Sequence, residues 1–198
     1  MVDLSKEQKL INATIKVASS IGLDNLTTKT ICAEAKLNEA YLYRSFNNKD
    51  HLLLVSYLNA SDRLMHLIVN EIDEQKKHLN DKSLKERTKA VFSKGWDYLT
   101  ENPDICRYLV YYYQSFQFTK YALPEHNKWT DVIVDKLNLE QYAKKEFART
   151  ILYIVFNTVF LMAKQVADGR LSKNDQMAEM VFESIFILIS ACYEGSKH

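Results

Sequence analysis

Residues 27–49 read TTKTICAEAKLNEAYLYRSFNNK and contain two short helical patterns separated by three residues. Thr27 or Thr28 can cap the first helix, because a threonine oxygen accepts one of the orphan amides at a helix start. Ile31 and Ala35 lie four residues apart and form one buried stripe. The first helix is therefore predicted to end at about Ala35.

The second pattern follows Leu37, an apolar residue in the turn, and Asn38, a good N-cap. Leu42 and Phe46 are again four residues apart and form its buried stripe. Together the two patterns predict a helix-turn-helix over about residues 28–47. That motif places its second helix in the major groove of DNA.

Hydrogen-bonding groups cover the other faces of the second helix. These residues are Glu39, Tyr41, Tyr43, Arg44 and Ser45. Arg44 has the chemistry to contact a guanine edge or a phosphate. Asn48 can cap a long helix that opens with Lys49, where the free amides and the ammonium both favour a phosphate. Shape alone also fits an ordinary three-helix bundle with no DNA role, because short helix pairs with apolar stripes are common.

The segment resembles the tetracycline-repressor (TetR) family of bacterial transcription regulators over about residues 5–60. The shared pattern is Leu-Thr-Thr-Lys-x-Ile, then Leu37, then Leu42-Tyr43-x-x-Phe46-x-x-Lys49-x-x-Leu52. The resemblance implies that Thr28, Tyr43 and Lys49 contact phosphates. It also assigns contacts with bases or backbone to the positions of Lys29, Glu39, Ala40, Tyr41 and Ser45. The candidate DNA-binding residues are Thr28, Lys29, Asn38, Glu39, Ala40, Tyr41, Tyr43, Arg44, Ser45 and Lys49.

Three residues depart from the pattern of the resembled family. Lys36 stands where glycine is usual, so it is expected to adopt a positive φ at some cost. Tyr41 is bulky where a small residue is usual, and Ala40 replaces a frequent glycine or proline. These changes leave the expected fold intact, but they prevent any operator sequence from being carried over.

Glycine and proline are scarce, with four and two residues among 198, which predicts a nearly all-helical chain because both break helices. The net charge is only +1. Within the first 60 residues, seven Lys or Arg residues oppose six Asp or Glu residues. DNA binding would therefore depend on where the charges are placed and on the doubling of contacts in a dimer.

No feature of the sequence indicates secretion, a membrane span or catalysis. The N-terminus is polar, and the longest apolar run, residues 151–163, is shorter than the roughly 20 residues that a spanning helix needs. The three cysteines fit reduced thiols in the cytosol. No phosphate-binding glycine loop, metal-binding spacing or nucleophile motif is present. We expect a cytoplasmic protein with no membrane partner, metal, cofactor or enzyme activity.

The predicted fold class is all-α, with about nine helices. Besides the helix-turn-helix, helices are expected over about residues 5–21, 49–79, 83–101, 103–117, 125–137, 140–167 and 173–194. Residues 1–48 would form a three-helix DNA-binding head. Residues 49–198 would form a larger helical domain, which the resemblance assigns to effector binding and dimerisation.

Aromatic residues are dense in the middle of the chain and suggest a pocket. Mostly apolar pockets with a few polar groups suit small molecules, although an aromatic stripe at helical spacing also fits an ordinary core. The resemblance favours an effector cavity among these middle helices. The candidate pocket residues are Trp96, Tyr108, Tyr112, Phe116, Phe156 and Phe160.

The last two predicted helices are apolar around much of their circumference, which requires burial on most sides. Pairing with the same helices of a second chain would give a two-fold four-helix core; a thick core within one chain is the alternative. The candidate interface residues are Ile151, Val155, Val159, Val181, Ile185 and Leu188.

These observations predict a sequence-specific DNA-binding transcriptional regulator that acts as a homodimer on a near-palindromic, double-stranded operator. It would be a repressor, released by a small hydrophobic or aromatic effector. One alternative is a helical regulator controlled by a protein partner. The other is a helical-bundle enzyme that does not bind DNA, for which the sequence offers no supporting motif.

Overall fold

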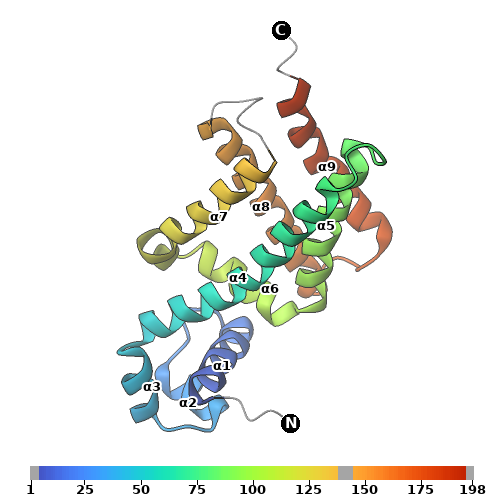
Figure 1. The fold of residues 1–198 in the computed structure, drawn as a ribbon. Helices are drawn as coiled ribbons and strands as arrows, with labels where there is room; N and C mark the ends of the chain where they lie inside the picture. The colour runs from blue at the N-terminus through green and yellow to red at the C-terminus, as the bar shows by residue number, and fades with distance from the viewer. Residues whose placement is uncertain (1–4, 138–144, 195–198) are drawn as a thin grey trace. The chain divides into compact units, whose positions relative to one another are not determined.

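The computed structural model describes residues 5–137 and 145–194, and within these ranges every regular element is a helix (Figure 1). The predicted all-α fold class is confirmed. The helices are α1 (Lys6–Ile21), α2 (Thr28–Ala35), α3 (Glu39–Phe46), α4 (Lys49–Lys76), α5 (Leu84–Glu101), α6 (Pro103–Tyr113), a short π-helix (Phe118–Ala122), α7 (Leu123–Lys136), α8 (Lys145–Ala167) and α9 (Asp175–Glu194).

The chain forms two compact units. The first comprises Met1–Asp62 and Pro103–Leu123, and the second comprises Arg63–Asn102 and Pro124–His198. The boundary predicted at residue 48 is therefore not where the packing divides the chain. The first half of α4 and the whole of α6 belong with the first three helices, because their apolar side chains complete the core of the first unit.

Local caps define the short helices of the first unit. The Thr27 side chain accepts from the Thr30 amide, and the Thr30 hydroxyl accepts from the Thr27 amide, so the two form a capping box. Ser5 caps α1 by accepting from the Gln8 amide at 3.1 Å. Gly22 ends α1 with a positive φ of 78° and an extended ψ of 166°.

The core of the first unit joins α4 to α6 through tyrosines. The Tyr108 hydroxyl, fully buried, donates to the Leu53 carbonyl at 2.7 Å. The rings of Tyr57 and Tyr112 stack with their centroids 4.6 Å apart. The Tyr112 hydroxyl is also buried, yet it makes no hydrogen bond with any residue that the structure describes. Burial raises the pKa of all three tyrosine hydroxyls, so they stay neutral.

Substituting Tyr108 and Tyr112 by phenylalanine is expected to change stability in opposite directions. Tyr108→Phe removes a buried hydrogen bond and should lower the free energy of unfolding by about 1 kcal/mol. Tyr112→Phe removes a buried hydroxyl that lacks a partner, so stability should stay unchanged or rise. Urea unfolding of the two variants beside the parent measures the difference. Equal losses would mean that the Tyr112 hydroxyl is satisfied in solution.

The second unit is built from the rest of α4 together with α5, α7, α8 and α9, and α5 packs against both α8 and α9. Ion pairs follow these contacts at the surface. Lys85 and Lys89 of α5 reach Glu183 and Glu179 of α9 at 2.6 and 2.5 Å. Arg149 of α8 makes two hydrogen bonds of 2.7 Å to Asp131 of α7. Exposed pairs of this kind contribute little stability, so the packed apolar faces hold the unit together.

Several predicted helix ends differ from the structure. The helix predicted over 103–117 ends at Tyr113, and a π-helical turn follows. The last helix begins at Asp175 rather than about 173, because Asn174 accepts from the Met177 amide at 2.8 Å. The predicted start of α8 at residue 140 lies outside the described residues.

Two helices are long and apolar enough to cross a membrane by length and composition, namely α4 and residues 147–167 of α8. Half of the apolar window of α4 is buried inside the protein, as expected for a core helix. Only 28% of the α8 window is buried, so much of its apolar surface faces outward.

Candidate nucleic-acid interface and internal cavity

The turn between α2 and α3 has the geometry that the sequence predicts. Lys36 adopts a left-handed conformation, with φ 55° and ψ 42°. This lets the Leu37 amide donate to the Cys32 carbonyl at 3.0 Å and close α2. Asn38 then caps α3 by accepting from the Tyr41 amide at 3.4 Å. The side chain of Asn38 therefore positions α3 and is occupied in doing so.

Helix α3 buries one face and exposes the other. Leu42 and Phe46 are buried, whereas Ala40 and Arg44 are exposed and the Tyr43 side chain is 50% exposed. Tyr41 and Ser45 are half-buried, and Lys29 is exposed at the start of α2. The predicted candidates therefore lie at or near the surface of the helix-turn-helix.

Tyr41 forms the centre of a small cationic cluster with Lys6 and Arg44. The Lys6 ammonium lies 4.0 Å from the centroid of the tyrosine ring, and the Arg44 guanidinium carbon lies 4.6 Å from it. A hydrogen bond to Lys6, and then the charges of Lys6 and Arg44, lower the pKa of the Tyr41 hydroxyl. The bulky residue at position 41 thus holds Arg44 against its ring. The sequence analysis missed Lys6, which no short-range pattern links to α3.

Thr28 and Glu39 are bonded to each other in this DNA-free structure. The Thr28 hydroxyl donates to Oε2 of Glu39 at 2.6 Å. The bond ties the starts of α2 and α3 together. It also holds a carboxylate at Thr28, a candidate phosphate-contacting position, where the negative charge would oppose a phosphate.

Removing the charge of Glu39 is expected to strengthen binding to DNA of any sequence. Glu39→Gln keeps an oxygen that can accept from Thr28, and should tighten binding to random duplex by about 0.2–1 kcal/mol per subunit. Fluorescence anisotropy with a labelled random duplex measures the change. Asp97→Asn, an exposed change of equal charge on α5, is the control and should have less effect. Weaker binding by Glu39→Gln would show that the carboxylate itself contacts the bases.

Lys49 fixes the start of α4 to the loop before α2. Its ammonium donates to the Leu26 carbonyl at 3.0 Å. Asn48 caps α4 as predicted, because its side chain accepts from the His51 amide at 2.8 Å. The ring Nδ1 of His51 lies 2.8 Å from the Phe46 carbonyl and binds the end of α3. Lys49 has two further N–H groups with which to contact a phosphate.

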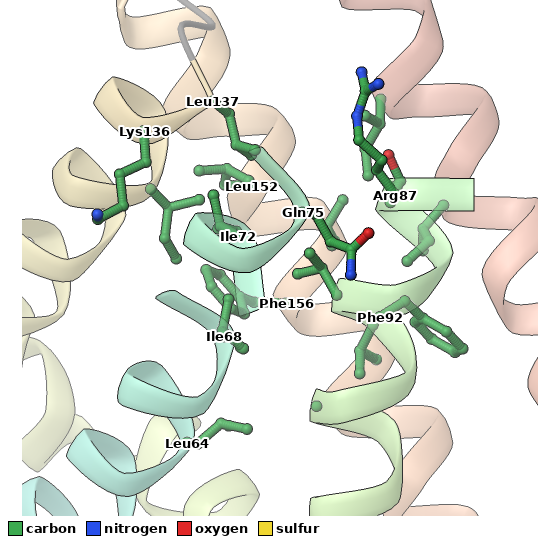
Figure 2. A pocket seen from close by; sticks show the side chains of 18 of the residues that line it. Leu64, Ile68, Ile72, Gln75, Arg87, Phe92, Lys136, Leu137, Leu152 and Phe156 are labelled. Atoms are coloured by element: carbon green, nitrogen blue, oxygen red, sulfur yellow. The ribbon is translucent and has the colours of Figure 1, made fainter. Parts of the chain in front are cut away.

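The second unit encloses a cavity of about 430 Å³, shown in Figure 2. Such a volume is within the range of small-molecule sites. One face of α4 lines it at helical spacing, with Leu64, Ile68, Ile72, Gln75 and Lys76, and Leu79 of the following turn also lines it. Helix α5 contributes Arg87, Thr88, Val91, Phe92, Gly95 and Leu99, and α7, α8 and α9 supply most of the remaining wall.

Two of the six predicted pocket residues, Phe156 and Phe160, line the cavity. The other four predicted residues do not line this cavity. Tyr108 and Tyr112 are buried in the first unit, and the Phe116 side chain is 75% exposed because α6 ends before it. Trp96 is buried behind the wall, with its ring centroid 5.6 Å from that of Phe92.

Most of the predicted interface residues face the interior of their own unit. Ile151, Val181 and Ile185 are at most 6% exposed, so they offer almost no surface to a second chain. Val155 and Val159 line the cavity, as does Ile185. Leu188 is half-buried. Both helices are apolar on two faces, and most of the predicted residues occupy the inner face.

Comparison with known proteins supports the helix-turn-helix. Residues 10–55 match the family described as "Bacterial regulatory proteins, tetR family". That span contains α2, α3 and the start of α4. None of the curated proteins matches the chain.

Solved structures share the fold over nearly the whole chain. A TetR family transcription regulator from Marinobacter aquaeolei VT8 is 19% identical, with a TM-score of 0.71 over 92% of this chain and 94% of its own. A putative tetR family regulator from Shewanella sp. PV-4 is 14% identical, with a TM-score of 0.72 over 93% and 97%. The fatty acid degradation regulator FadR from Bacillus halodurans is 18% identical, with a TM-score of 0.65 over 95% and 96%.

The family match over residues 10–55 agrees with the geometry of α2 and α3. The solved structures share the fold of the rest of the chain. Both also agree with the resemblance seen in residues 27–49. Residues 10–55 thus match the tetR family of bacterial regulatory proteins, and the chain shares the fold of tetR-family transcription regulators of known structure.

Proposed function

We propose that this protein is a homodimeric repressor that leaves a near-palindromic operator when a small hydrophobic molecule fills the cavity of the second unit. The observation that carries the proposal is that one chain holds both an exposed candidate recognition helix and a cavity large enough for a small molecule. It has an exposed α3 with Tyr43 and Arg44 at its surface, and a separate cavity of about 430 Å³. Acting on chromosomal DNA would place the protein in the cytoplasm.

Two copies of α3 are needed to explain binding by a nearly neutral chain. A two-fold dimer would present them about 34 Å apart, or somewhat more, to successive major grooves on one side of the duplex. Each half-site would meet Thr28, Tyr43 and Lys49 at phosphates, with Arg44 at a base edge. Doubling these contacts doubles the counterion release that supports binding.

The exposed apolar residues of α8 and α9 support the dimer. Phe147, Ile154 and Leu161 recur every seven residues along α8, and Met180 and Ile187 are also seven apart on α9. All five side chains are at least 38% exposed in the single chain. We call them the seam residues. A seven-residue apolar repeat is the pattern by which helices pack against partner helices, so we propose the seam residues as the interface in place of the set expected from the sequence.

Release by a ligand follows from thermodynamic linkage. A molecule that favours a conformation with the wrong spacing of the two α3 helices weakens DNA binding, and DNA weakens its binding by the same factor. The cavity wall is mostly aliphatic and aromatic, which suits a hydrophobic effector. One structural neighbour, FadR, is named as a regulator of fatty acid degradation.

A selection from genomic DNA tests the proposal. Purified protein would be incubated with fragmented DNA of its source organism at moderate salt, and the retained fragments would be sequenced. We expect a recurring near-palindromic site, and anisotropy on that site should show two chains bound per duplex. Retention of fragments without a common sequence, by protein freed of bound ligand, would contradict the proposal.

A further inference from the structure

The cavity is lined by α4 and α5 over several turns of each helix. A Cβ placed on Gly95 of α5 would lie 3.7 Å from Ile68 and 3.9 Å from Leu64, near the start of the α4 wall. At the other end, the Arg87 guanidinium donates to the Leu79 carbonyl at 3.3 Å. The lining residues of α4, from Leu64 to Lys76, span roughly 18 Å at 1.5 Å per residue. A lining of that length accommodates an extended chain.

The polar groups of the cavity gather at one end. In Figure 2, Gln75, Arg87 and Lys136 lie toward one side, and Ile68 and Leu64 lie toward the other. This follows from the fold, because the polar residues come from the end of α4, the start of α5 and the end of α7. The opposite end is lined by apolar side chains. The cavity is therefore amphipathic along its length.

The charged residues of the lining are all basic, namely Lys76, Arg87 and Lys136. Lys136 is neutralised by Asp73, with both carboxylate oxygens within 2.7 Å of its ammonium. Arg87 donates instead to two backbone carbonyls, those of Leu79 and Lys82, and makes no ion pair with any residue that the structure describes. Its positive charge is thus held in place at the polar end without a carboxylate beside it.

We infer that the cavity binds a long-chain fatty acid, with its carboxylate at Arg87 and its tail along α4 toward Ile68. A guanidinium fork matches a carboxylate, and charge-assisted hydrogen bonds of this kind are stronger than neutral ones. A cationic ligand would meet only positive charge in the lining. This inference names the effector class of the regulator proposed above, but binding of the fatty acid is measured without DNA.

The first test compares palmitate with hexadecanol, which has the same tail and no charge. The full-length protein, freed of bound lipid, would be titrated by calorimetry with each probe below its aggregation concentration. We expect palmitate to bind at least about tenfold more tightly, because a hydrogen bond to a charged group is lost with the alcohol. Equal affinities for the two probes, or no binding of palmitate, would overturn the inference.

Arg87→Gln should weaken palmitate binding by about tenfold to a hundredfold and leave hexadecanol unchanged. Lys94→Gln is the matched control, because Lys94 is exposed on the same helix and does not line the cavity. It removes the same charge and should change neither affinity. Equal weakening of both probes by Arg87→Gln would mean that the residue only shapes the cavity, and would overturn its assignment as the carboxylate partner.

A second variant tests the placement of the tail without touching Arg87. Ile68→Phe adds volume at the apolar end, so it should weaken palmitate much more than octanoate, whose shorter tail does not reach that end. Equal effects on both acids would overturn the proposed orientation. Anisotropy on the operator is measured separately. Palmitate that binds but leaves DNA affinity unchanged would support the fatty-acid site and contradict the proposed release mechanism.

Discussion

Ile187→Glu is expected to convert the protein from a dimer into a monomer. Ile187 is the most exposed seam residue, with 66% of its surface accessible in the single chain. Its replacement therefore costs the fold of the subunit little. In a two-fold interface the same change introduces two carboxylates into an apolar seam, and burying an unpaired charge costs several kcal/mol per ion.

Analytical ultracentrifugation measures this change directly. The sedimenting mass should fall from twice the chain mass of 23.1 kDa to the chain mass itself. Phe116→Glu is the control, because Phe116 is 75% exposed and belongs to the other unit. That variant should remain dimeric. A dimeric Ile187→Glu protein would show that the seam residues do not form the interface.

Operator binding should change together with the assembly state. A monomer offers one recognition helix, so it loses the avidity of two linked half-sites, worth about 10²–10⁴-fold in affinity. The slope of log affinity against log salt should also fall to about half, because half of the phosphate contacts remain. A monomeric variant that kept full operator affinity would contradict the two-helix docking.

Short-range chemistry explains why the head could be predicted in detail. The caps at Thr27, Asn38 and Asn48 depend on side chains that bond amides within three residues. The positive φ of Lys36 follows in the same way from its place at the end of α2. The link between Thr28 and Glu39 was not predicted, because it joins two helices and depends on their angle.

The cavity could not be predicted from spacing, because periodicity shows that a face is buried but not what it packs against. Tyr108 and Tyr112 share a face of α6 as expected, yet that face meets Leu53 and Tyr57 in the first unit. Conversely, no spacing pattern in the sequence marks Gln75 or Arg87 as cavity residues. Only the antiparallel approach of α4 and α5 brings them to the same end of the cavity.

The seam residues illustrate a different limit of prediction from sequence. The seven-residue recurrence of Phe147, Ile154 and Leu161 is readable in the sequence. However, α8 carries a second apolar face that includes Ile151 and Val155. Sequence alone does not say which face turns inward, and the structure shows that the second face lines the core and the cavity of its own unit.

Arg44→Ala is expected to reduce operator affinity by about 1–3 kcal/mol at each half-site, or about 2–6 kcal/mol for the dimer. Arg44 is exposed on α3, and the Tyr41 ring beneath its guanidinium restricts the side chain before DNA arrives. Such preorganisation lowers the entropy cost of a bidentate contact with guanine. The loss should therefore be specific, with the variant tolerating any base at one position of each half-site.

Two comparisons separate base reading from simple charge attraction by Arg44. Arg44→Lys keeps the charge but lacks the planar fork, so it should lose specificity at the same position while its affinity for random DNA stays near the parent value. Lys49→Ala should weaken binding to all sequences alike and lower the salt slope by about one per subunit. Anisotropy over a panel of single-base operator variants, at several salt concentrations, measures both effects. If Arg44→Ala behaved like Lys49→Ala across that panel, Arg44 would be a phosphate contact, and base recognition would rest on the remaining exposed residues of α3.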